Sequence, residues 1–93
     1  MRKSKREKLE TRFRVLQKAQ ESLDYQNFDD CLMLENEYIN LLNEWSFFDY
    51  LIFSKKEDIE LHDRIRYACE KHMKKFEEEN EQYKEWNERM SVF

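Results

Sequence analysis

The chain contains no glycine and no proline in 93 residues, where average usage predicts about a dozen of the two together. Without glycine, no residue adopts left-handed backbone angles at low cost, and without proline no corner has a fixed φ. Phosphate-binding loops and strained nucleophile elbows need glycine, so both are excluded. These absences predict a few long helices and argue against most classes of enzyme.

Long hydrophobic runs are also missing, since none is longer than the four residues found, for example, at positions 50–53. A membrane-spanning helix needs about 20 apolar residues, so no membrane segment is predicted. No apolar signal region follows the basic N-terminus, which favours a cytoplasmic location. Only two cysteines occur, Cys31 and Cys69, and two such distant residues do not form a disulfide framework. We expect both to be buried thiols.

Hydrophobic residues make up 40% of the chain and aromatic residues 15%, and these fractions are too high for a disordered chain. Charged residues make up 41%. The charge is distributed unevenly. Residues 1–18 hold eight basic and two acidic side chains, residues 19–54 hold eight acidic and none basic, and residues 55–93 hold nine basic and eleven acidic. The sequence therefore predicts a basic arm, an acidic apolar middle and a mixed C-terminal helix.

Hydrophobic periodicity predicts an all-α fold with helices over residues 4–23, 28–52 and 55–90. The first begins at a capping box formed by Ser4 and Glu7, and Asn27 is the expected N-cap of the second. A stripe at alternating spacings of four and three marks the inner face of the first helix: Leu9, Phe13, Leu16, Gln20 and Leu23.

A second capping box, Ser54 with Glu57, is expected to start the third helix. Its coiled-coil-like stripe is His62, Ile65, Cys69, His72, Phe76, Glu79, Tyr83, Trp86 and Met90. We expect residues 1–93 to form one helical domain, a three-helix antiparallel bundle whose long third helix overhangs the bundle or bends. The alternative is an extended helical hairpin that dimerises, and the second and third helices could also form one kinked rod.

Candidate chemistry is sparse. Cys69 and His72 share a helical face, but His62 lies about 10 Å away along the axis, too far to join them around one ion. A thin bundle offers no obvious cleft for a substrate. The sequence therefore predicts no metal site, no cofactor, no small-molecule substrate and no enzymatic activity.

Two charged surfaces are candidates for binding. The basic start of the chain could contact nucleic acid or an acidic partner through Arg2, Lys3, Lys5, Arg6, Lys8, Arg12 and Arg14. Carboxylates along rigid helices could instead imitate nucleic-acid phosphates. The candidates near the C-terminus are Glu77, Glu78, Glu79, Glu81, Glu85 and Glu88, and those in the middle are Asp24, Asp29, Asp30, Glu35, Glu37 and Glu44.

The end of the third helix carries large apolar side chains with few expected partners inside the chain: Tyr83, Trp86, Met90 and Phe93. Aromatic residues and Met are enriched at protein interfaces, so these four are the predicted partner-binding residues. The sequence favours a small non-enzymatic binding protein, an inhibitor or regulator that occupies a surface of another protein complex or of a second copy, as in a homodimer. Amino acids with A/T-rich codons, such as Lys, Asn, Ile, Tyr and Phe, are plentiful, and together with the small size this fits a phage accessory protein. The alternative function is a DNA-binding regulator that uses the basic first helix.

Overall fold

The computed structural model describes residues 1–47, 49 and 55–91, and all regular structure in these ranges is helical. The all-α prediction is therefore confirmed. The described part has four helices rather than the three expected: α1 (Lys3–Glu21), α2 (Phe28–Leu42), α4 (Lys56–Glu79) and α5 (Glu81–Ser91).

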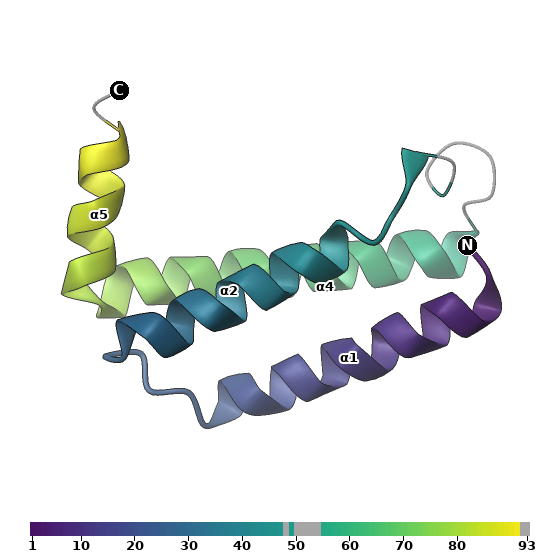
Figure 1. The fold of residues 1–93 in the computed structure, drawn as a ribbon, viewed down its shortest axis with the longest axis horizontal. Helices are drawn as coiled ribbons and strands as arrows, with labels where there is room; N and C mark the ends of the chain where they lie inside the picture. The colour runs from purple at the N-terminus through teal and green to yellow at the C-terminus, as the bar shows by residue number, and fades with distance from the viewer. Residues whose placement is uncertain (48, 50–54, 92–93) are drawn as a thin grey trace.

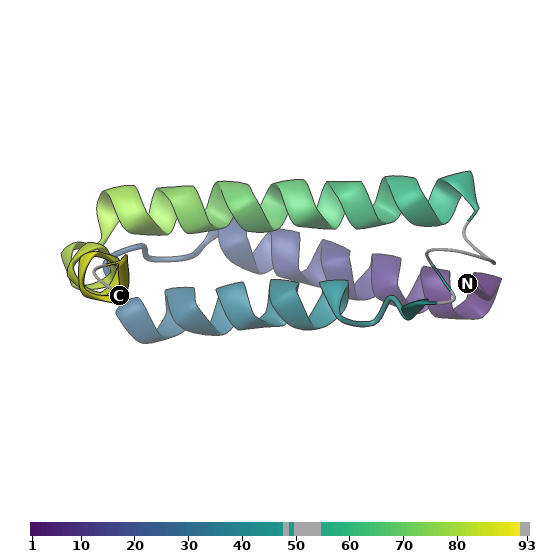
Figure 2. The ribbon, with the colours of Figure 1, turned by 90° about the horizontal axis from the view of Figure 1, so that it is seen from above.

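Three of these helices, α1, α2 and α4, lie alongside one another and alternate in direction (Figure 1). Viewed from above, α2 and α4 lie side by side with α1 beneath them (Figure 2). The short helix α5 turns away from the axis of α4 and stands at one end of the molecule, while the N-terminus lies at the other end (Figure 1).

The core has two parts. The larger lies between α1, α2 and α4, where Phe13 meets Tyr38 edge to face with their ring centroids 6.3 Å apart. The smaller lies at the α5 end and contains Tyr25, Cys31, Phe76 and Tyr83. Leu9 and Phe13 in α1, and Ile65, Cys69 and Phe76 in α4, are buried as the predicted stripes require.

The first helix begins one residue earlier than predicted. Its N-cap is Arg2, which is extended and makes no side-chain capping bond, so the expected N-cap Ser4 lies inside the helix. The cause is Met1, whose buried side chain and ion-paired amino group hold the chain before α1. Asn27 caps α2 as predicted, and its side-chain oxygen accepts a hydrogen bond from the Asp30 backbone N–H at 3.1 Å.

The second helix ends at Leu42, ten residues before the predicted end. After it, Trp45 is buried, with its ring edge-on to the His62 imidazole at 5.1 Å. Ser46 and Asp49 then exchange hydrogen bonds: the Ser46 N–H donates to the Asp49 carboxylate at 2.7 Å, and the Asp49 N–H donates to Ser46 Oγ at 3.2 Å. This is a capping box, and its Ser-x-x-Asp spacing marks a new turn that the sequence interpretation missed.

The start of α4 also differs from the prediction. The helix begins at Lys56, and the Lys55 N–H donates to the Asp58 carboxylate at 3.4 Å, so Asp58 rather than Glu57 takes the capping position. The other half of the expected capping box, Ser54, lies outside the described residues. Because α2 ends at Leu42 and α4 begins at Lys56, they are separate helices and not one kinked rod.

The prediction of a single long third helix is wrong. The chain leaves the helical conformation at Asn80, where φ is −120° and ψ is 110°, and a new helix starts at the next residue. Of the two outcomes expected for a helix longer than its neighbours, the chain bends and does not continue straight past the bundle.

Candidate functional site

Asn80 forms the break between α4 and α5. Its side chain is buried, its Nδ2 donates to the Tyr25 carbonyl at 3.0 Å, and its Oδ1 accepts from the Tyr83 N–H at 3.0 Å. The second bond makes Asn80 the N-cap of α5. Gln26 donates to the Glu79 carbonyl at 2.8 Å, which satisfies an acceptor at the end of α4. The loop before α2 and the break after α4 therefore hold each other in place.

Tyr83 fixes the base of α5 against the bundle. Its ring is 2% exposed and stacks on Phe76 with centroids 3.8 Å apart and planes 13° from parallel. Its hydroxyl donates to Glu35 Oε1 at 2.9 Å, and burial raises the pKa of Tyr83 to about 12. An unpaired buried carboxyl group is costly, so this bond ties the orientation of α5 to α2.

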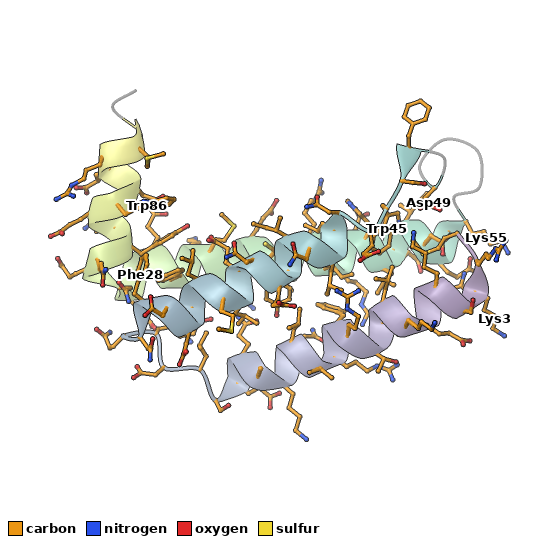
Figure 3. All side chains as sticks on the ribbon, in the orientation of Figure 1. Lys3, Phe28, Trp45, Asp49, Lys55 and Trp86 are labelled. Atoms are coloured by element: carbon orange, nitrogen blue, oxygen red, sulfur yellow. The ribbon has the colours of Figure 1, made fainter. Side chains whose placement is uncertain are left out.

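Trp86 and Met90 lie beyond this anchored base. They are four residues apart, on one side of α5, and are 46% and 59% exposed. The indole of Trp86 is stacked against the Tyr83 ring with the ring centroids 5.8 Å apart. One side of the indole is therefore packed against the protein, while about half of the residue remains exposed to solvent. Figure 3 places Trp86 on α5 at the end of the molecule that also holds Phe28.

The four predicted partner-binding residues therefore do not share one environment in the structure. The prediction for Tyr83 is wrong, because its side chain belongs to the core and is not available to a partner. The reason is the bend at Asn80, which brings the first turn of α5 back against α2 and α4. Trp86 and Met90 are accessible, and Phe93 lies outside the described residues.

The acidic residues at this end are all exposed, but they do not form one straight row. Glu77, Glu78 and Glu79 end α4, whereas Glu81 and Glu85 belong to α5. The bend therefore points the two groups along different axes, and Lys84 and Arg89 interrupt the acidic side chains of α5. In the middle of the chain, Glu35 is buried and is excluded as a surface mimic of phosphate.

Five of the seven predicted basic contact residues form ion pairs within the described part of the chain. Lys5 donates to the Glu44 carbonyl at 2.6 Å and lies 3.5 Å from Asp49, and Arg6 pairs with Asp58 at 3.2 Å.

Farther along α1, Arg12 lies 3.5 Å from Glu44 and Arg14 lies 3.2 Å from Glu10. Lys3 approaches only Glu7, at 4.0 Å. Arg2 and Lys8 are exposed, and no side-chain ion pair engages them within the described ranges. The basic arm is thus partly neutralised by the protein itself.

A buried ionic cluster centres on Asp58. Its Oδ2 is 3.2 Å from the amino group of Met1, and its Oδ1 is 3.2 Å from Arg6. Burial acts to raise the pKa of this carboxyl, but the hydrogen bonds from Arg6 and the Met1 amino group outweigh it and lower the pKa. The Met1 amino group also lies 3.6 Å from Asp49. This cluster joins the starts of α1 and α4 to the segment after α2.

A chain of neutral hydrogen bonds crosses the other end of the core, and the sequence interpretation did not foresee it. Tyr38 donates to Gln20 at 2.6 Å, and Gln20 donates to the Tyr25 hydroxyl at 3.1 Å. The Tyr25 hydroxyl is 2.9 Å from His72 Nδ1, and His72 Nε2 is 2.9 Å from the Cys31 carbonyl.

The direction of that chain follows from its ends. A carbonyl only accepts, so His72 Nε2 carries the proton and Nδ1 accepts from Tyr25. This assignment holds for the uncharged ring, which burial favours by lowering the pKa of His72. Both ring nitrogens are occupied, which leaves neither to a metal ion.

The remaining candidate groups are structural. Burial raises the pKa of both thiols, Cys31 and Cys69, to about 11, so they are poor nucleophiles. Across the described residues, no three His, Cys, Asp or Glu side chains are placed to hold a metal ion together. A groove of about 1110 Å³ runs between α1 and α4, but it is open and is lined by both acidic and basic side chains.

Comparison with known protein families, with curated proteins and with solved structures finds no match to this chain. Within the described ranges, no helix has the length and apolar character needed to cross a membrane.

Proposed function

We propose that this protein is a non-enzymatic binding protein that inserts the side of α5 carrying Trp86 and Met90 into a surface of another protein, and so inhibits or regulates it. The observation that carries the proposal is the pairing of a fixed base with an exposed tip. Asn80 and Tyr83 hold α5 in one orientation, while Trp86 and Met90 remain about half exposed.

This arrangement favours affinity for two reasons. Trp is among the residues that contribute most to binding when a partner buries it, and Met adapts its shape to uneven pockets. A helix already held in its binding orientation loses less conformational entropy on association than a mobile segment does. The exposed carboxylates beside it, such as Glu81 and Glu85, would form a polar rim and favour a basic partner surface.

The experiment is affinity capture from the cells that naturally make the protein, together with sedimentation of the purified chain. The test variant is Trp86→Ala/Met90→Ala. The matched control is Val15→Ala/Tyr67→Ala, which removes two apolar side chains that are 62% and 66% exposed on α1 and α4. Both variants should keep the helical circular dichroism, because exposed substitutions change stability by about 0.5 kcal/mol or less.

The expected result is a protein retained by the wild type and by the control and lost with the α5 variant. If the partner is a second copy, the sedimentation coefficient should fall in the α5 variant alone. Retention of the same proteins at the same level by all three chains, with unchanged sedimentation, would contradict the proposal.

A second candidate function is contact between nucleic acid and the basic start of α1, favoured by the exposed Arg2, Lys3 and Lys8. Duplex DNA should then be retarded in a gel at about 50 mM salt, where phosphate contacts are strong. Replacing these three residues by Ala should abolish the shift, and no shift with the wild type rejects this candidate.

A further inference from the structure

A second surface lies between the end of α1 and the start of α2, where these helices run side by side (Figure 1). A pocket of about 390 Å³ opens there, lined only by α1, α2 and the first residues of their connection. It is as open to solvent as the groove between α1 and α4 but smaller, and its volume falls within the range typical of ligand pockets. None of its lining residues comes from α5, so it is separate from the surface proposed above.

The walls of this pocket are apolar. Leu16, Ala19 and Leu23 line it from the α1 side, and Met33 and Leu34 line it from α2. Met33 is 63% exposed, whereas Leu34, the next residue in α2, is buried. An exposed Met beside an apolar pocket is typical of surfaces that adapt to a bound apolar side chain.

The rim of the pocket carries charge of one sign. Asp24, Asp30 and Glu37 line it, and no Lys or Arg does. The sequence contains no basic residue anywhere in positions 19–54, so α2 cannot neutralise its own carboxylates. Within the part of the chain that the structure describes, no ion pair engages the side chains of these three residues. The carboxylates of the rim differ in this from Glu44, which lies farther along and pairs with Arg12.

We propose that this pocket docks a basic amphipathic segment of a protein partner, with one large apolar side chain in the pocket and Lys or Arg residues beside the rim. Charge complementarity selects this occupant. An acidic or neutral segment would bring no compensating charge to three carboxylates, whereas a basic one gains attraction to each of them. Because α5 is not involved, the chain could join two different surfaces.

The experiment uses the full chain with its Met methyl groups labelled with ¹³C, and the Met33 signal is assigned from the Met33→Leu variant. The probes are two helical peptides of equal length, one with Leu anchors flanked by Lys and one with the same anchors flanked by Glu. The Lys peptide should shift the Met33 signal at concentrations up to about 1 mM, so that even a Kd in the millimolar range is detected. The Glu peptide should leave that signal in place.

The test variant is Asp30→Asn/Glu37→Gln, which keeps the shape of the rim and removes two charges. The matched control is Glu60→Gln/Glu70→Gln, which removes two exposed charges from α4. The test variant should bind the Lys peptide about two- to thirtyfold more weakly, since it removes two charges and each exposed charge pair contributes about 0.2–1 kcal/mol. The control should bind like the wild type.

Three results would overturn this proposal: no shift of Met33 with the Lys peptide, equal binding of both peptides, or equal weakening in the test and control variants. The Trp86→Ala/Met90→Ala variant should bind the Lys peptide as the wild type does. Failure of the α5 proposal is therefore distinguishable from failure of this one.

Discussion

The two ends of the molecule are held together by different chemistry. At the end that carries α5, mainly neutral groups hold the chain: Asn80 bridges to the Tyr25 carbonyl, and Tyr83 stacks on Phe76 while its hydroxyl donates to the Glu35 carboxyl group. At the opposite end, the ion pairs of Asp58 with the Met1 amino group and Arg6 hold the chain. Figure 3 labels Lys3, Asp49 and Lys55 at this end of the molecule. Directional neutral hydrogen bonds fix one orientation, whereas ion pairs tolerate movement and respond to salt and acid. The neutral end is therefore suited to presenting a rigid helix.

The largest expected effect comes from the ionic end. Replacing Asp58 by Asn leaves the Met1 amino group and Arg6 beside an uncharged buried side chain, which should lower the free energy of unfolding by about 3 kcal/mol. Urea titration followed by circular dichroism measures this. The exposed control Asp63→Asn should change stability by about 0.5 kcal/mol or less. A loss below about 1 kcal/mol in Asp58→Asn would mean that the cluster is not a structural tie.

The next effect lies at the neutral end. Tyr83→Phe keeps the stacked ring but removes the donor to Glu35, and should cost about 1–3 kcal/mol because a buried carboxyl group loses its partner. In the double variant Tyr83→Phe/Glu35→Met both polar groups are gone, so much of that loss should be recovered. Together with the single variant Glu35→Met, the free energies of unfolding of the four chains (wild type, two single variants and the double variant) form a double-mutant cycle. Additive losses would show that Glu35 and Tyr83 do not interact.

The two ends should also differ in their response to pH. Burial lowers the pKa of His72, so the unfolded chain binds a proton more readily than the folded one, and stability should fall as the pH drops below about 6.5. Burial lowers the pKa of His62 as well, so His62→Gln serves as the comparison. The pKa of Asp58 is lowered too, and its contribution should persist until the pH falls below about 3.9.

Urea titrations at several pH values test this difference. His72→Gln should flatten the loss of stability between about pH 6.5 and 5 more than His62→Gln does, because His72 is the more deeply buried ring. Asp58→Asn should flatten only the loss below about pH 4. If neither histidine variant changes the slope near pH 6, both rings titrate alike in the folded and unfolded chains.

The smallest effect belongs to the exposed ion pairs of α1. Arg12 and Glu44 lie 3.5 Å apart with about half of each side chain exposed, so Glu44→Gln should cost about 0.2–1 kcal/mol at low salt. Salt at 1 M should erase that difference, because it shortens the screening length to about 3 Å. A loss that survives 1 M salt would point to packing of the Glu44 side chain instead of charge.

The helical class, the inner stripes of α1 and α4 and the cap at Asn27 follow from local rules, because periodicity and capping depend on residues three and four apart. The break at Asn80 does not follow from local rules. A lone Asn within a helical pattern costs little by propensity, and its effect comes from Tyr25, 55 positions away in the chain. The sequence also predicts wrongly that Tyr83 is exposed, for the same reason, since its burial depends on the break at Asn80. In contrast, Ser46 and Asp49 carry a local capping signal that the density of apolar residues around them obscured.

The orientation of α5 is the central claim, and a distance distribution measured by pulsed electron paramagnetic resonance tests it most directly. Spin labels at Asn36→Cys on α2 and Arg89→Cys on α5 occupy exposed positions, while Cys31 and Cys69 react slowly because burial raises their pKa to about 11. The labelled chain should give one narrow distance, and adding Asn80→Ala should lengthen or broaden it. A broad distribution without that substitution, or an identical one with it, would contradict the claim that Asn80 fixes α5.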